Sequence, residues 1–130
     1  MAPVRIVIIE DDYLIASDME GALTEAGFDV AAVAHSAEEM LEIAAKTSPS
    51  PALAVVDIRL SGKRDGIDAA HELLAQHGIR CIFATAHQTP QMRKRAEKAK
   101  PLAWIAKPYA MPTLVEAVRH AVRDLGEGVR

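Results

Sequence analysis

Five short apolar runs alternate with five longer segments of helical periodicity, and this alternation limits the possible folds more than any other feature. The runs are rich in β-branched residues and apolar at nearly every position, as expected of strands covered on both faces. They span residues 4–9, 28–33, 52–56, 79–84 and 102–106. Alternating strands and helices predict an α/β fold with a parallel sheet between two helical layers. Right-handed crossovers then favour a doubly wound, five-stranded sheet.

The segments between the runs carry apolar stripes at helical spacing and residues typical of helix ends. Ser36 and Glu39 are spaced as a capping box ahead of the second stripe. Thr89-Pro90 places a capping residue before a proline at the first helical position. Glycines follow three of the stripes, where C-terminal caps are expected: Gly27, Gly78 and Gly126. The sequence therefore predicts five helices, one after each strand.

Length and composition limit the class of protein. The 130 residues correspond to one domain, predicted here to span 1–130 with no output domain after it. The net charge of −3 does not indicate nucleic-acid binding or an anionic membrane partner. Cys81 is the one cysteine, so an internal disulfide is excluded and a cytoplasmic location is favoured. The first apolar run is too short to span a membrane, so no membrane insertion is expected.

Polar side chains follow four of the predicted strands, at the edge where sites gather in open parallel sheets. Glu10, Asp11 and Asp12 follow the first strand and Asp57 follows the third. The fourth and fifth strands end in polar residues as well: Thr85 and Lys107-Pro108. The proline restricts Lys107 to extended backbone, which directs its side chain back over the sheet edge.

This set of residues suits phosphoryl chemistry. Crowded carboxylates raise one another's pKa values, and a divalent cation relieves that repulsion. All-oxygen ligands favour a hard ion such as Mg²⁺. A carboxylate beside Mg²⁺ can attack phosphorus and form an acyl phosphate, while an ammonium and a hydroxyl stabilise the phosphoryl oxygens. Each residue alone would be an ordinary cap, loop or surface residue, and only their conjunction predicts a site.

The same residues resemble the two-component response-regulator receiver domain. The matching segments are Ile8-Ile9-Glu10-Asp11-Asp12, Val55-Val56-Asp57, Asp65-Gly66, Phe83-Ala84-Thr85-Ala86 and Lys107-Pro108-Tyr109. The resemblance implies a flavodoxin-like sheet of order 2-1-3-4-5. It implies Asp57 as phosphoacceptor with Thr85 and Lys107 as its catalytic partners. It also implies Mg²⁺ bound by Asp11, Asp57, Glu10 through water, and the backbone carbonyl of Arg59, with Asp12 outside the pocket.

Three features depart from the family pattern. The loop after Asp57 is one residue longer than the common form, with Ser61-Gly62 as a suitable turn. Trp104 stands where the family usually has a tyrosine or phenylalanine that switches together with Thr85, and a plain core tryptophan is the alternative. Arg59 and His87 occupy positions that tune dephosphorylation in the family, and solvated loop residues are the alternative for both.

The resemblance also implies partners. A histidine kinase or histidine phosphotransferase would donate the phosphoryl group. A downstream protein would bind the face made by the fourth helix, fifth strand and fifth helix. Five basic residues of the fourth helical segment suit an acidic partner or a second receiver in a homodimer: Arg93, Lys94, Arg95, Lys98 and Lys100. The domain would catalyse only its own phosphorylation and dephosphorylation, with no organic cofactor.

Three alternatives remain open at this point. A pseudo-receiver would share the fold and bind proteins without taking phosphate. A phosphatase of the haloacid dehalogenase type also uses an aspartate and Mg²⁺, but its nucleophile follows the first strand. A flavodoxin would carry a phosphate-binding loop after the first strand, and Glu10-Asp11-Asp12 stands there instead. Of the other reactive side chains, Cys81 is predicted to be buried, and His71, His77 and His120 to lie at the surface.

Overall fold

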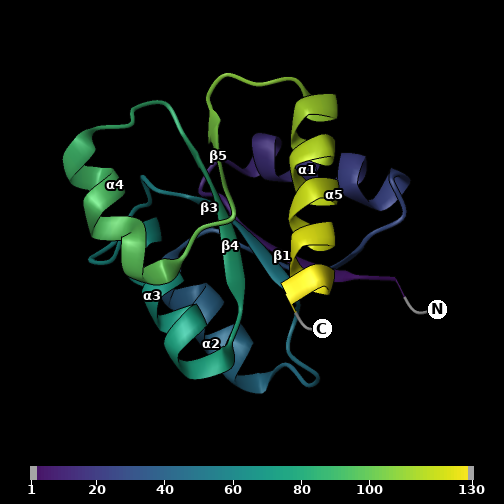
Figure 1. Ribbon diagram of the computed structural model, residues 1–130, viewed down its shortest axis with the longest axis horizontal. Helices are drawn as coiled ribbons and strands as arrows, with labels where there is room; N and C mark the ends of the chain where they lie inside the picture. The colour runs from purple at the N-terminus through teal and green to yellow at the C-terminus, as the bar shows by residue number, and fades with distance from the viewer. Residues whose placement is uncertain (1–2, 129–130) are drawn as a thin grey trace.

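A computed structural model of the protein describes residues 3–128 as a five-stranded parallel sheet with helices on both faces (Figure 1). The strand order is β2-β1-β3-β4-β5, as the sequence predicted. The strands are β1 (Arg5–Ile9), β2 (Asp29–Ala34), β3 (Leu53–Asp57), β4 (Arg80–Thr85) and β5 (Ala103–Ala106). The central strands β1 and β3 therefore end next to each other, at the position where the predicted acidic residues lie.

Helices follow each strand and form two layers. They are α1 (Tyr13–Glu25), α2 (Ala37–Lys46), α3 (Gly66–His77), α4 (Pro90–Ala96) and α5 (Met111–Gly128), with a 3₁₀ turn η1 (Glu97–Ala99) after α4. Residues of α1 and α5 pack on one face of the sheet, and residues of α2, α3 and α4 pack on the other. The doubly wound architecture predicted from the alternation is confirmed.

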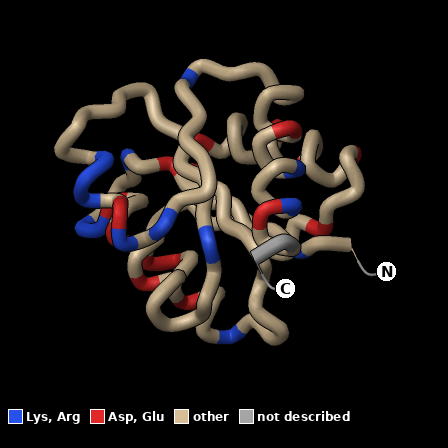
Figure 2. The backbone as a smooth tube through the Cα atoms, in the orientation of Figure 1, with Lys and Arg blue, Asp and Glu red and all other residues tan. Residues whose placement is uncertain are grey.

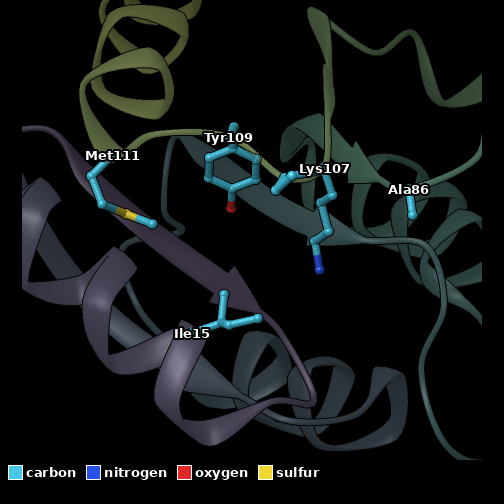
Figure 3. A pocket seen from close by; sticks show the side chains of 6 residues that line it. Ile15, Ala86, Lys107, Tyr109 and Met111 are labelled. Atoms are coloured by element: carbon cyan, nitrogen blue, oxygen red, sulfur yellow. The ribbon is translucent and has the colours of Figure 1, made fainter.

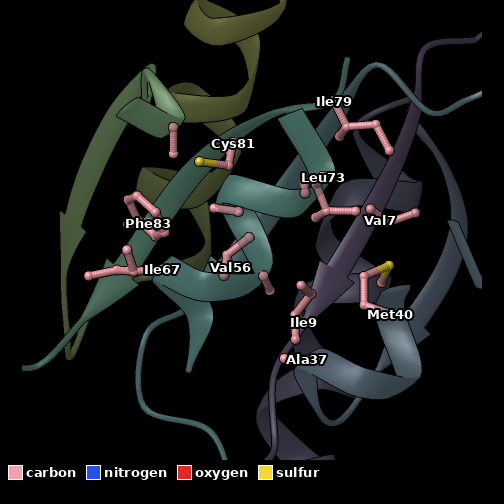
Figure 4. Packing of buried hydrophobic residues seen from close by; sticks show 14 of the residues in the cluster. Val7, Ile9, Ala37, Met40, Val56, Ile67, Leu73, Ile79, Cys81 and Phe83 are labelled. Atoms are coloured by element: carbon pink, nitrogen blue, oxygen red, sulfur yellow. The ribbon is translucent and has the colours of Figure 1, made fainter. Parts of the chain in front are cut away.

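Each strand contributes to both hydrophobic cores because successive side chains point to opposite faces of a sheet. Ile6 and Ile8 of β1 pack toward α1 and α5, whereas Val7 and Ile9 pack toward α2 and α3. Figure 4 shows the second of these cores, where Phe83 of β4 lies beside helix α3. This two-sided burial explains why the strands read as continuous apolar runs and not as alternating patterns.

The helix ends agree with the sequence in most places and differ in two. Thr89 caps α4, and Gly78 ends α3 in the left-handed conformation (φ 67°). Ser36 caps α2, but the Glu39 carboxylate accepts from the backbone N–H of His35, so the predicted capping box is not closed. Gly126 does not end α5, which continues to Gly128. A glycine costs only about 1 kcal/mol within a helix, so the helix can continue past Gly126 after the apolar stripe that precedes it.

The charged residues are distributed unevenly over the fold. Every charged side chain between residues 6 and 45 is acidic, a stretch that includes α1 and most of α2. Basic residues gather instead on α4 and η1, at the left of Figure 2. Among residues 3–128, every helix is too short or too polar to cross a lipid bilayer.

Candidate functional site

The ends of β1 and β3 bring three carboxylates together. Glu10, Asp11 and Asp57 each offer an oxygen, and these oxygens lie within 4.8 Å of one another. Glu10 and Asp57 are buried, with 1% and 6% of their surface exposed, whereas Asp11 is exposed. Asp11 is therefore the most solvent-accessible of the three carboxylates.

Lys107 supplies the positive charge in this cluster. Its Nζ donates to Oε1 of Glu10 at 2.7 Å and to Oδ2 of Asp57 at 3.1 Å. Burial acts to lower the pKa of Lys107, but its hydrogen bond with Glu10 and the charge of Asp57 outweigh burial and raise that pKa above its usual value. The ammonium therefore stays charged between the two buried carboxylates.

The charge and donor atoms of the cluster fit a divalent cation. Three carboxylates and one ammonium leave a net charge of −2, and all the free donor atoms are oxygens, which suits a hard ion. Burial raises the pKa of Asp11, and a hydrogen bond and the negative charge of Glu10 raise it further. A cation bound by Glu10, Asp11 and Asp57 would offset the part of this rise that comes from the negative charge of Glu10.

Glu10 is held from several sides. Its Oε2 accepts from the backbone N–H of Asp12 at 3.1 Å, and its carbonyl accepts from Nδ1 of His35 at 2.9 Å. The His35 ring in turn stacks on Tyr13, with centroids 3.8 Å apart. Sequence reasoning missed His35, although the parallel register that pairs Ile9 with Ala34 places the next residue, His35, beside Glu10.

Asp12 has a different role from its two acidic neighbours. Its carboxylate accepts from the backbone N–H groups of Leu14 and Ile15, at 2.9 and 3.1 Å, and so caps α1. It lies outside the carboxylate cluster. The run of three acids therefore divides between the pocket and the helix that begins beside it.

The backbone after Asp57 is packed tightly against the start of α3. Oδ1 of Asp57 accepts from the N–H of Arg59 at 3.2 Å, and the N–H of Gly66 donates to the carbonyl of Ile58 at 2.8 Å. A Cβ on Gly66 would lie 2.1 Å from the Asp57 carbonyl oxygen, so only glycine fits at this position. Asp65 caps α3 in a reciprocal capping box with Asp68.

Thr85 ends β4 with a buried hydroxyl that contacts the following loop. Its Oγ1 donates to the carbonyl of His87 at 3.0 Å and accepts from the N–H of His87 at 3.3 Å. The side chains of His87 and Arg59 are both exposed. In this arrangement the single hydroxyl proton of Thr85 is directed to the loop and not to Asp57.

Trp104 lies half-buried on β5, on the side of the sheet that α4 covers. Its ring packs against Phe83, with centroids 4.9 Å apart, and the Arg93 guanidinium lies 4.8 Å from the Trp104 centroid. These contacts agree with both interpretations of Trp104, the switch residue and the plain core residue. The ring packs at the edge of the hydrophobic core, and it also contacts Arg93 of α4.

A cavity of about 370 Å³ lies beside the cluster (Figure 3). Its walls are mainly apolar and come from α1, the β4–α4 loop, the β5–α5 loop and the start of α5: Ile15, Ala86, Lys107, Pro108, Tyr109 and Met111. The Tyr109 hydroxyl is buried without a hydrogen-bond partner among the described residues, and burial raises its pKa to about 12. Tyr13 and Leu14, at the start of α1, are 71% and 79% exposed.

Two predictions for individual side chains have different outcomes. Cys81 is buried as predicted, and burial raises the pKa of its thiol to about 12, so it is an inert core residue. The prediction that His71 lies at the surface is wrong. The side chain is half-buried on α3, and its Nε2 is buried with no hydrogen-bond partner in the described part of the chain.

Comparison with known proteins agrees with this geometry. Residues 6–119 match the family described as the response regulator receiver domain. This chain is a response regulator receiver domain. The receiver is 32% identical over 125 residues to the transcriptional regulatory protein PdtaR of Mycobacterium tuberculosis, and 38% identical over 114 residues to the phyllosphere-induced regulator PhyR of Methylorubrum extorquens.

The receiver covers only part of these relatives. The alignments include 96% and 88% of this chain, but 60% of PdtaR and 41% of PhyR. Among solved structures, the signal receiver domain of a modulated diguanylate cyclase from Desulfovibrio desulfuricans is 31% identical, with a TM-score of 0.86. That alignment covers 97% of this receiver and 98% of the solved chain.

Family membership settles several expectations. The chain is a two-component signalling domain with an acidic pocket made by Glu10, Asp11 and Asp57. Phosphorylation and Mg²⁺ are typical of this family, whose members interact with kinases and other proteins and are generally not enzymes in the usual sense. The phosphatase and flavodoxin alternatives are excluded, and the pseudo-receiver alternative shares this family and fold.

Proposed function

We propose that the receiver accepts a phosphoryl group on Asp57 from the phosphohistidine of a histidine kinase or histidine phosphotransferase. The observation that carries this proposal is the contact between Lys107 and Asp57 within a cluster of net charge −2. An oxygen of Asp57 forms a bond to phosphorus as the phosphorus–nitrogen bond of the donor breaks. The imidazole nitrogen keeps that electron pair, and a proton on its other ring nitrogen lets the donor histidine leave as neutral imidazole.

The neighbouring side chains have separate roles in this transfer. Glu10, Asp11 and Asp57, with the backbone carbonyl of Arg59, would hold Mg²⁺, which offsets charge on the phosphoryl oxygens when bound. Lys107 is 3.1 Å from Asp57 and pairs with a phosphoryl oxygen there. Thr85 donates its hydroxyl proton to another phosphoryl oxygen after releasing the His87 carbonyl. Trp104, beside Phe83, follows that movement as the second switch residue.

Partners reach the receiver at two places in this proposal. The donor binds beside the pocket, where the exposed Tyr13 and Leu14 and the cavity lined by Ile15 and Tyr109 provide an apolar surface. A downstream protein, or a second receiver in a homodimer, binds the face of α4, β5 and α5. Residues 1–130 act as one receiver unit in the cytoplasm, with no direct contact to nucleic acid.

Thermal unfolding with Mg²⁺ and beryllofluoride tests the proposal, because beryllofluoride mimics a phosphoryl group on an aspartate. Ligand at about 100 times its Kd adds about 2.7 kcal/mol of stability, which raises the Tm by about 10 °C in a domain of this size. We expect this rise in the wild type and only when Mg²⁺ is present. Asp57→Ala should show no rise, since the acceptor oxygen is gone.

The opposite result would favour the pseudo-receiver alternative. A wild-type protein that binds Mg²⁺ but shows no beryllofluoride response would have a pocket that cannot hold a phosphoryl group. A response of the same size in Asp57→Ala would place the phosphoryl group on another residue. Either result would overturn the assignment of Asp57.

Arg59 and His87 set the lifetime of the phosphoryl group in this proposal. Both follow a site residue by two positions, and both side chains are exposed, where water must enter to hydrolyse the acyl phosphate. Replacing them together, as Arg59→Asn and His87→Ser, should shorten the phosphate half-life several-fold because smaller side chains open the path for water. The half-life is measured as the rate at which the phosphorylated protein releases inorganic phosphate. An unchanged half-life would indicate that Arg59 and His87 are only solvated loop residues.

A further inference from the structure

The basic residues of α4 and η1 do not form one uniform surface. Lys94, Lys98 and Lys100 are exposed, and their side chains make no ion pair or hydrogen bond within the part of the chain that the structure describes. Arg93 and Arg95 instead contact the body of the domain. The two arginines therefore anchor α4 although they are partly exposed, whereas the lysines make no such contact within the described residues.

Arg95 joins α4 to the first turn of α3. Its Nη2 donates to Oδ1 of Asp65 at 2.8 Å and to Oδ1 of Asp68 at 3.0 Å. The same two acids form the capping box of α3, in which each carboxylate accepts from the backbone N–H of the other residue. One guanidinium thus bridges both side chains that define where α3 begins.

The start of α3 is in turn fixed to the phosphoacceptor. Gly66 follows Asp65 directly and packs on the backbone carbonyl of Asp57 with no room for a side chain. Its N–H donates to the carbonyl of Ile58 at 2.8 Å. A continuous set of contacts therefore runs from Asp57 through the first turn of α3 to Arg95 on α4.

Few other contacts hold α4 in place, and one of them is the half-buried Met92, which packs against the hydrophobic core. The helix has seven residues, and Ala96 is the one residue of α4 that is buried. Arg93 adds its contact with the Trp104 ring and a hydrogen bond to Gln88. Since a short helix with one fully buried residue gains little from packing, the Arg95 bridge is a notable part of its anchorage.

The Thr85 hydroxyl gives a reason why α4 must be released. It has one proton, and that proton is donated to the carbonyl of His87 in the loop that leads into α4. Donation to a phosphoryl oxygen on Asp57 requires that this bond break. The loop and the helix that follows it are then free to move, unless another contact holds the helix.

We propose that the bridge from Arg95 to Asp65 and Asp68 is a latch that holds α4 in the resting arrangement and so opposes occupation of the phosphoryl site. This inference rests on the proposed function. A contact present mainly in the resting state lowers the apparent affinity for any ligand that requires the other state. Loss of the bridge therefore makes phosphoryl binding tighter, whereas loss of an ordinary structural contact leaves binding unchanged or weaker.

Beryllofluoride binding to Arg95→Gln in the presence of Mg²⁺ tests the latch. Trp104 is the single tryptophan of the chain and contacts Arg93, so its fluorescence reports the position of α4. We expect the variant to bind beryllofluoride about threefold to fivefold more tightly, the range of a partly exposed ion pair. Its fluorescence without ligand should move toward the value of the ligand-bound wild type.

Three further variants separate the latch from a general effect of charge. Lys98→Gln removes one positive charge from the same surface and should bind beryllofluoride like the wild type. Asp68→Asn keeps an acceptor for the capping box but weakens the pairing with Arg95, so it should shift affinity in the same direction as Arg95→Gln. The double variant with Arg95→Gln and Asp68→Asn should gain less affinity for beryllofluoride than the product of the two separate gains, because both substitutions break the same bridge.

The outcomes distinguish the latch from the proposed function. If the wild type itself does not respond to beryllofluoride, the proposed function fails. If the wild type responds but Arg95→Gln binds with equal or lower affinity, the latch is overturned while the phosphoacceptor stands. Tighter binding by Lys98→Gln as well would also overturn the latch, since net charge alone would then explain the effect.

Discussion

Replacing Lys107 with methionine is expected to slow phosphorylation by about 10²–10³-fold, the usual effect of removing one preorganised group that stabilises developing charge. Methionine has a similar length but no charge, so the pocket keeps its shape and loses the ammonium between Glu10 and Asp57. Incubation with phosphoramidate and Mg²⁺, followed by mass spectrometry of the intact protein, measures the rate. A rate within threefold of the wild type would contradict the role of Lys107.

The same substitution should alter stability in a way that depends on Mg²⁺. Without the metal, the buried Glu10 and Asp57 carboxylates lose their counter-charge, and we expect a loss of about 1–3 kcal/mol in the free energy of unfolding. Saturating Mg²⁺ should make this loss of unfolding free energy smaller, because the bound cation supplies the positive charge that the ammonium no longer provides. Lys46→Met is the matched control. Its partner Glu42 is exposed, so the expected change is within about 0.5 kcal/mol under both conditions.

Gly66→Ala is expected to destabilise the domain by about 3 kcal/mol or more and to abolish beryllofluoride binding. The new Cβ would meet the Asp57 carbonyl oxygen at 2.1 Å and the Ile58 Cα at 2.8 Å, so backbone must move instead of a side chain. That backbone carries Asp57, the proposed phosphoacceptor. Chemical denaturation gives the loss of stability, and the thermal shift with Mg²⁺ and beryllofluoride gives the loss of binding.

Gly21→Ala is the matched control for this substitution. Gly21 lies in α1 and is exposed, and a Cβ there would meet no atom within 4 Å. Alanine in a helix is about 1 kcal/mol better than glycine, so this variant should be slightly more stable than the wild type and bind beryllofluoride normally. If Gly66→Ala and Gly21→Ala had the same stability and the same beryllofluoride binding, the close packing of Gly66 on Asp57 would be shown to be unimportant.

The strand order and the meeting of Glu10, Asp11 and Asp57 were predictable because both follow from local patterns and one topological rule. Apolar runs identify the strands, and parallel strands end at one edge of the sheet. The role of Asp12 as a cap could also be anticipated, since an acid just before a helical stripe commonly accepts from its first N–H groups. In these cases the signal lies within a few residues of the structure that it determines.

The contacts that sequence reasoning missed join residues far apart in the chain. Arg95 reads as one member of a basic run, and nothing nearby indicates that it reaches Asp65, thirty positions earlier. Glu39 has the spacing of a capping box, but the competing N–H of His35 takes its carboxylate. Tertiary placement decided both cases, because a charged side chain has several partners within reach and only the fold brings one of them close.

The uneven distribution of charge gives the receiver an electric dipole in addition to its net charge. Helix α1 carries only acidic charged side chains, whereas the charged side chains of α4 and η1 are all basic except Glu97 and form the blue region at the left of Figure 2. A charged molecule approaching through water experiences this field before it touches the surface. Positively charged partners are therefore attracted toward α1, and negatively charged partners toward α4. The sign of a partner's charge thus influences which of these helices it meets first. Rising ionic strength screens the field and weakens this preference at both helices.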